Sequence, residues 1–125
     1  MQVVTDVRIW HFGGLAQATQ RLDEIPKLNI SAITYPELLQ GIRSTTEPCV
    51  VQKSLALRYT KRLPVTSAIT ERAVGLMENL GLSHSLRLGD ALIATTAIEH
   101  GLALLTANTK HFAVIDGIRM ERFEP

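Results

Sequence analysis

Cysteine is almost absent from this sequence, and so are long apolar runs and any excess of charge of one sign. The single Cys49 excludes an internal disulfide and a cysteine-rich zinc site, and it suits a reducing compartment. No apolar run approaches the roughly twenty residues that span a bilayer. The N-terminus also lacks the basic and apolar regions of a signal peptide. We therefore expect a cytoplasmic protein with no membrane contact.

Lys and Arg number 13 against 12 Asp and Glu, which gives a formal net charge of +1. Any contact with nucleic acid must then come from a local basic patch. The chain has 125 residues, of which 46% are hydrophobic and 20% are charged, an ordinary balance for a globular protein. We see no internal repeat and no linker, and we expect one domain over residues 1–125.

Short β-branched or apolar runs alternate with stretches of helical periodicity along the chain. The strands are expected at Gln2–Thr5, Asn29–Ala32, Leu63–Val65, Leu102–Thr106 and Ile118–Arg122. The helices are expected at Leu15–Ile25 (after a break near Gly13 and Gly14), Thr34–Arg43, Val50–Arg58, Thr70–Leu80 and Asp90–His100.

Two local signals refine these expectations. Pro64 confines the third strand to an edge or an entry position, and Gly101 stands where a glycine commonly closes a helix. Strands that alternate with helices predict an α/β protein with a parallel sheet and helices on both faces. In such sheets the functional crevice lies beyond the carboxyl ends of the strands.

Polar residues follow the predicted strands at those ends. Asp6 follows the first strand, Glu37 lies in the helical turn after the second, and Asp90 begins the helix that leads into the fourth. Thr106 and Asn108 follow the fourth strand. Gathered carboxylates repel one another, and a hard cation removes that repulsion. Oxygen ligands favour Mg²⁺ or Mn²⁺ over zinc, and such a site suits phosphodiester hydrolysis.

Each of these residues also has a purely structural explanation. Thr34 and Glu37 have the spacing of a capping box. Asp90 would be favoured at a helix start by the helix dipole alone, and Asp6 could cap a first helix. The polar pair after the fourth strand could be ordinary turn residues.

Three blocks of the chain resemble the PIN-domain family, in its VapC-type toxin branch. They are TDVRIW at Thr5–Trp10, ISAITYPELLQGIR at Ile30–Arg43 and LSHSLRLGDALIATTAIEHGLALLTANTKHF at Leu82–Phe112. The closing RMERFEP also fits, so the resemblance spans nearly the whole chain in the family's order. It implies a three-layer α/β/α PIN fold and an endoribonuclease that depends on Mg²⁺ or Mn²⁺. It further implies a homodimer, neutralised by a cognate VapB-type antitoxin through which alone operator DNA would be contacted.

The resemblance assigns roles to four positions. Glu37 in PELLQG matches the second acid of the family, and Asp90 in GDALIA matches the third. Asn108 in TANTKHF stands where many members carry a fourth acid and others carry Asn. Thr106 matches the small hydroxyl residue beside the site.

The first block departs from the family pattern Leu-Asp-Thr-Asp-Val-Leu-Ile-Trp. Ungapped, Val4 stands where the first metal-binding Asp belongs, and a deletion of that Asp is the other reading. Asp6 then matches the accessory polar residue two positions on. Val4 offers no oxygen to a cation, and the loss of one catalytic ligand often lowers the rate on the order of a thousandfold.

Two functional classes therefore stay open. The first is a metal-dependent endoribonuclease toxin, inactivated in this form by Val4. The second is a non-catalytic PIN-like module that retains dimerisation and antitoxin or RNA binding. A receiver-like domain ranks below both, because the chain lacks an acidic pair after the first strand and a phosphorylatable Asp after the third.

Residues around the predicted site suggest secondary contacts. Arg87 and Lys110 adjoin it in sequence and are the preferred candidates for the RNA phosphate backbone. For His84 and His111 a surface or hydrogen-bonding role is favoured over metal ligation, because their spacing matches no zinc motif. The apolar face of residues 38–42 suits the core or a groove for an antitoxin helix.

Overall fold

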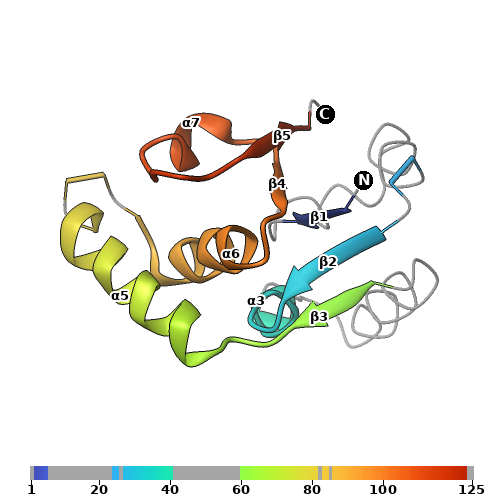
Figure 1. Cartoon of the computed structure of the whole chain (residues 1–125), viewed down its shortest axis with the longest axis horizontal. Helices are drawn as coiled ribbons and strands as arrows, with labels where there is room; N and C mark the ends of the chain where they lie inside the picture. Colours follow the sequence, from blue (N-terminus) through green and yellow to red (C-terminus); the bar gives the residue numbers. More distant parts are fainter. Residues whose placement is uncertain are drawn as a thin grey trace.

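The structure is a computed structural model that describes residues 2–5, 24–25, 27–40, 60–81, 83–84 and 86–123. Five parallel strands form one sheet in the order β3-β2-β1-β4-β5, and Figure 1 shows this arrangement. The strands are β1 (Gln2–Thr5), β2 (Lys27–Ser31), β3 (Lys61–Leu63), β4 (Ala103–Thr106) and β5 (Met120–Arg122).

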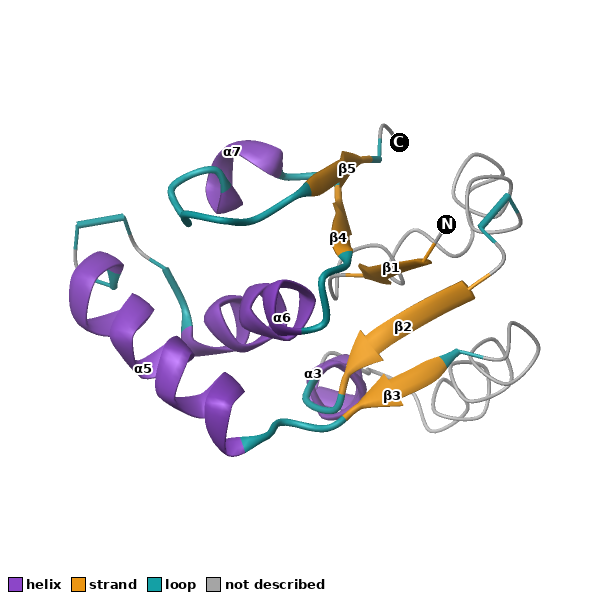
Figure 2. Cartoon of the chain, viewed as in Figure 1, coloured by secondary structure: helices purple, strands orange, loops and turns teal. Residues whose placement is uncertain are grey.

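The helices connect and cover the strands, as Figure 2 shows by colour. They are α3 (Thr34–Gln40), α5 (Ser67–Leu80), α6 (Leu88–Glu99) and the short α7 (Thr109–Phe112). Among these, none has the length and apolar character that a membrane crossing requires.

The central strand β1 is buried on both faces, as expected for a parallel sheet. Val4 pairs with Asn29 of β2 and Leu104 of β4, and both Val3 and Val4 are fully buried. Side chains alternate across the sheet. Val4 and Leu104 belong to the core cluster that holds the apolar residues of α6, whereas Val3 belongs to a second cluster with Leu28, Leu105 and Phe123.

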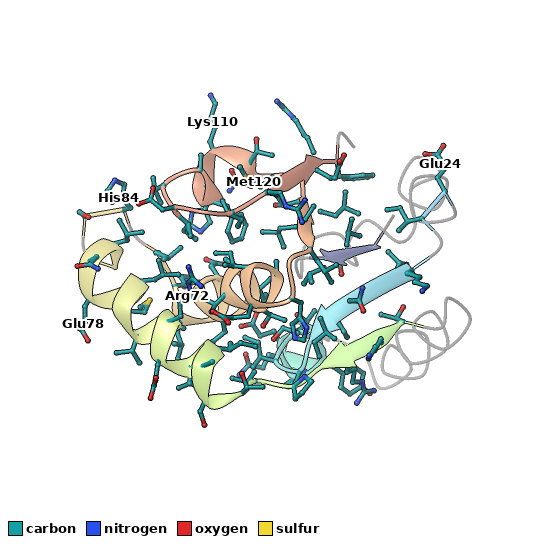
Figure 3. All side chains as sticks on the ribbon, in the orientation of Figure 1. Glu24, Arg72, Glu78, His84, Lys110 and Met120 are labelled. Carbon is teal, nitrogen blue, oxygen red and sulfur yellow. The ribbon has the colours of Figure 1, made fainter. Side chains whose placement is uncertain are left out.

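Helix α6 lies against β1, β2 and β4, and α5 packs on α6. The side chains that α6 buries are small or β-branched, which lets the helix lie close to the sheet: Ala91, Ile93, Ala94, Thr95, Thr96 and Ala97. Helix α5 begins at an N-cap, Thr66, whose hydroxyl accepts from the Ile69 amide at 3.3 Å. An ion pair of 2.8 Å joins Arg72 of α5, labelled in Figure 3, to Glu99 of α6.

The α/β class with a central parallel sheet is confirmed, and β1 has the expected bounds. The expected strand at residues 63–65 lies instead at Lys61–Leu63, directly before Pro64, which has no amide hydrogen for a ladder. That strand is an edge strand of the described sheet, as Pro64 predicts. The Leu15–Ile25 helix was expected to run to Ile25, but Glu24 and Ile25 are not helical. Its remainder and the Val50–Arg58 helix lie outside the described residues.

Candidate active site

The carboxyl ends of β1, β2 and β4 meet at one edge of the sheet, because these neighbouring strands run in parallel. The chain order reverses at β1, which makes this edge the topological switch point of the sheet. Helix α6 precedes β4 and runs back across the sheet, so its first turn lies at the same edge. That turn carries Asp90, and the turn of α3 after β2 carries Glu37.

Glu37 reaches α6 at Gly89. A β-carbon built on Gly89 would lie 2.9 Å from the Glu37 carboxyl carbon and 3.2 Å from Oε2, and closer still to Oε1. Both distances are tighter than ordinary van der Waals contact, so a side chain at position 89 would force the Glu37 carboxylate to move from its place. The absence of a side chain at Gly89 is therefore what lets Glu37 lie beside Asp90.

The charges at this edge act on one another. Partial burial raises the pKa of Glu37, the negative charge of Asp90 raises it further, and the Arg87 guanidinium works in the opposite direction. The structure gives the Glu37 carboxylate no hydrogen bond and no ion pair within the described residues. Glu37 is thus a half-buried carboxylate beside a second one, with no bonded cation.

Asp90 does have a partner. The His111 Nε2 lies 2.8 Å from Asp90 Oδ2, and the side chains of both residues are about one quarter exposed (25% and 29%). A carboxylate can only accept, so Nε2 carries the proton and donates. The hydrogen-bonding role that the sequence favoured for His111 is confirmed. His84 also forms one, through Nδ1 at 2.8 Å from Ser83 Oγ.

Thr106 ends β4 and is fully buried, and its hydroxyl accepts from the Asn108 amide at 3.0 Å. This is the turn function that the structural explanation required. Asn108 is the N-cap residue of α7, yet its side chain makes no capping bond. Asn108 stands three residues before His111, so the turn after β4 contributes to the same edge as Asp90.

Val4 lies one residue before the carboxyl end of β1. It is fully buried in the cluster that contains Ala91 and Phe112, the chain neighbours of Asp90 and His111. Position 4 thus supplies a methyl surface and no oxygen. Asp6 lies outside the described residues, and within those residues no group of three His, Cys, Asp or Glu side chains is placed to hold a metal ion.

The capping-box alternative for Glu37 is wrong. Helix α3 begins at Thr34 itself, and the buried Thr34 hydroxyl has no hydrogen-bond partner. The Ser31 hydroxyl instead accepts from the Ile33 amide at 3.4 Å. Helix α6 begins at Leu88, two residues before Asp90, with the exposed Arg87 at its N-cap. Asp90 still lies in the first turn, where the helix dipole favours an acid, as the structural explanation of Asp90 requires.

Sequence reasoning did not single out Gly89, and it left His111 without a partner. A glycine in the first turn of a helix lowers helix propensity, and this cost was the one available signal that Gly89 serves another purpose. Lys110 is exposed on α7, and Figure 3 shows its side chain directed away from the sheet.

The model of the PIN domain matches residues 3–118. The chain belongs to the PIN domain family. Within that family it is similar to Ribonuclease VapC10 of Mycobacterium tuberculosis H37Rv, with 36% identity over 121 residues, 94% of this chain and 89% of that protein.

The chain is also similar to solved structures. A toxin–antitoxin complex from Klebsiella pneumoniae is 32% identical, with a TM-score of 0.70 over 93% of this chain and 94% of that one. VapBC2 from Rickettsia felis, solved with a DNA fragment from its promoter, has a TM-score of 0.81 at 20% identity and covers 99% of this chain and 100% of that one. The second likeness concerns the fold alone. The resemblance to VapC-type PIN domains read from the sequence is confirmed.

Proposed function

We propose that this chain is the toxin component of a type II toxin–antitoxin system, a divalent-metal-dependent endoribonuclease that cleaves RNA phosphodiester bonds. The observation that carries the proposal is the Glu37–Asp90 pair, in which the half-buried Glu37 lies within the field of the Asp90 charge at the carboxyl edge of the parallel sheet. The name of VapC10 describes a ribonuclease, and this supports RNA as the substrate.

The donors at this edge fit a small hard cation. Two neighbouring carboxylates raise each other's energy unless a positive charge lies between them. Mg²⁺ keeps several of its waters and is commonly held by one or two carboxylates together with substrate phosphates. Glu37 and Asp90, with Asp6 as a further ligand, would hold Mg²⁺ or Mn²⁺.

These contacts suggest a separate role for each residue at the site. A divalent cation held by these residues would supply activation of water and stabilisation of charge on the phosphate. Glu37 and Asp90 fix the place where this occurs. The exposed Arg87, which has no ion pair in the described structure, binds the RNA phosphate backbone. The half-buried Asn108, whose side-chain amide makes no hydrogen bond there, orients the phosphate, and Thr106 holds the turn that presents it.

Val4 limits this activity. An Asp at position 4 would place a carboxylate one residue before the carboxyl end of β1, the strand at the switch point, whereas Val4 contributes only apolar surface. We expect the chain to cleave RNA weakly or not at all. This same observation favours the second candidate function, a non-catalytic PIN module that keeps dimerisation and antitoxin or RNA binding.

The proposal includes partners. The names of solved neighbours describe toxin–antitoxin complexes, some of them bound to DNA. By analogy, this chain would form a homodimer in the cytoplasm, be neutralised by a VapB-type antitoxin and contact operator DNA only through that antitoxin.

The decisive experiment compares RNA cleavage by the unsubstituted chain and by Val4→Asp, with Mg²⁺ or Mn²⁺ and with EDTA. Val4→Asp is expected to gain metal-dependent cleavage on the order of a thousandfold. The gain should vanish when Glu37→Gln and Asp90→Asn are added.

Val3→Asp is the matched control, because Val3 is equally buried but belongs to the cluster on the other face of the sheet. It should bring no cleavage. Val4→Asn tests the same position without a charge. If Val4→Asp folds, binds Mn²⁺ and still leaves RNA intact, the nuclease proposal is wrong and the binding module stands.

A further inference from the structure

Asp90 accepts a hydrogen bond from His111, whereas Glu37 has no such partner among the described residues. Asp90 Oδ2 accepts from His111 Nε2 at 2.8 Å, while the Glu37 carboxylate accepts from no described residue. Asp90 Oδ1 also makes no hydrogen bond in the described structure. One Asp90 oxygen is thus held and the other is left open.

His111 is itself held by its surroundings. Its amide donates to the Asn108 carbonyl at 3.2 Å, which fixes the backbone within α7. Its ring packs edge-on against Phe112, with centroids 5.1 Å apart and an interplanar angle of 78°. Phe112 is only 2% exposed and belongs to the core cluster beneath α6. The buried Phe112 ring therefore restricts the orientation of the His111 imidazole.

We propose that His111 is a positioning residue for Asp90. By holding Oδ2, it sets the orientation of the carboxylate and leaves Oδ1 available to bind a cation. It also joins the turn after β4, which carries Asn108, to the first turn of α6. The inference rests on the proposed function, because it concerns the metal that Asp90 would hold.

A positioning role for His111 agrees with the way metal ligands are usually held in proteins. Ligating side chains are commonly oriented by a hydrogen bond from a second residue, and the loss of that partner typically lowers metal affinity about 10–100-fold. The alternative is a tether that only joins α7 to α6. A tether would affect the unfolding of the metal-free chain and leave the metal affinity of the folded chain unchanged.

The test is Mn²⁺ binding by calorimetry to the full chain, without RNA. His111→Ala is expected to weaken Mn²⁺ binding about 10–100-fold. His111→Gln should recover most of the affinity, because the Gln side-chain amide can donate from nearly the place of Nε2. His84→Ala is the matched control, since His84 is exposed beyond the end of α5 (Figure 3), and it should bind as the unsubstituted chain does.

Each variant is also unfolded in urea without metal, so that loss of affinity is separated from loss of structure. Equal Mn²⁺ affinity of His111→Ala and the unsubstituted chain overturns the inference and leaves the proposed function intact. The inference is also overturned if His111→Ala loses Mn²⁺ affinity only because the chain unfolds, and His111→Gln fails to restore that affinity. If the unsubstituted chain binds no Mn²⁺, the same comparison in the Val4→Asp background decides. No binding in either background overturns both proposals.

Discussion

Single residues set the spacing of the candidate site. Glu37 and Asp90 come from different helices, and they approach each other because residue 89 has no side chain. The electrostatic cost of this approach falls on Glu37, whose pKa is raised by burial and by the charge of Asp90. A residue without any functional group, Gly89, is therefore as important to the geometry as the acids themselves.

We expect Gly89→Ala in the Val4→Asp background to lose metal-dependent cleavage by roughly 10²-fold, the scale of a displacement of about 1 Å. The new methyl group would occupy the place of the Glu37 carboxylate. A steady-state RNA cleavage assay measures the loss. Gly75→Ala is the matched control: it lies in α5 with open space around it, and it should gain about 0.5–1 kcal/mol of stability without changing activity. Equal activity of the two variants would contradict the prediction.

The raised pKa of Glu37 predicts a dependence of stability on pH. The folded chain binds this proton more tightly than the unfolded chain does. The corresponding stability is fully present below the ordinary glutamate pKa and is lost as the pH rises through the raised value. In metal-free buffer at pH 7, Glu37→Gln should therefore unfold at a higher urea concentration than the unsubstituted chain.

This difference should shrink below about pH 4, where the ordinary glutamate is largely protonated in both states. Glu78→Gln, at an exposed position of α5, is the control and should shift the midpoint at neither pH. Equal urea midpoints for Glu37→Gln and the unsubstituted chain at pH 7 would show that the ionised Glu37 does not destabilise the folded chain.

At the scale of elements, α6 links the core to the site. Its small buried residues lie on the sheet, its first turn carries Asp90, and its far end is closed by Gly101 at a φ of +65°. The amide of Gly101 donates to the Ile98 carbonyl at 3.1 Å, and that of Leu102 to the Ala97 carbonyl at 2.9 Å. This closure satisfies two carbonyls of the last turn before β4 begins.

We expect Gly101→Ala to lower the free energy of unfolding by about 1–2 kcal/mol, because a β-carbon is disfavoured in the left-handed conformation. Gly101→Asn should cost less, since asparagine tolerates that conformation better. Urea denaturation measures both. Mn²⁺ affinity of the folded variants should stay unchanged, because Gly101 and Asp90 lie at opposite ends of α6. A loss of affinity with Gly101→Asn would show that the helix end influences the site.

At the scale of the whole molecule, the parallel sheet gathers residues from positions 37, 90 and 106–111 at one edge. Glu37 of α3 and Asp90 of α6 would hold a cation there together, although the two helices are far apart in the chain. Binding to the folded state alone stabilises it by mass action.

Mn²⁺ should therefore raise the melting temperature of the Val4→Asp chain. The stabilisation should be about 2.7 kcal/mol at a concentration one hundred times the dissociation constant. Differential scanning calorimetry with and without EDTA measures it. The control is the Val4→Asp chain that also carries Glu37→Gln and Asp90→Asn, which have similar shapes but no charge. Mn²⁺ should leave the melting temperature of this control unchanged. An equal rise in that control would mean that the metal binds elsewhere.

The sequence by itself determined the order of the five strands and of helices α3, α5 and α6, although not the short helix α7. Periodicity located β1, α5, α6 and β4, Gly101 marked the end of α6, and Pro64 marked an edge strand, because these signals act between near neighbours in the chain. Alternation of strands and helices then required a parallel sheet, with its polar residues at one edge. Family blocks added the roles expected of Glu37 and Asp90.

Only the tertiary structure decided how these residues meet. Nothing in the sequence around Gly89 indicates that Glu37 lies against it, and nothing near His111 indicates a bond to Asp90, 21 residues earlier. The tertiary structure likewise shows that Thr34 and Glu37 form no capping box and that Val4 is fully buried in the core cluster with α6. The physical reason is that such contacts depend on the register of strands and the packing of helices, which residues distant in the chain determine together.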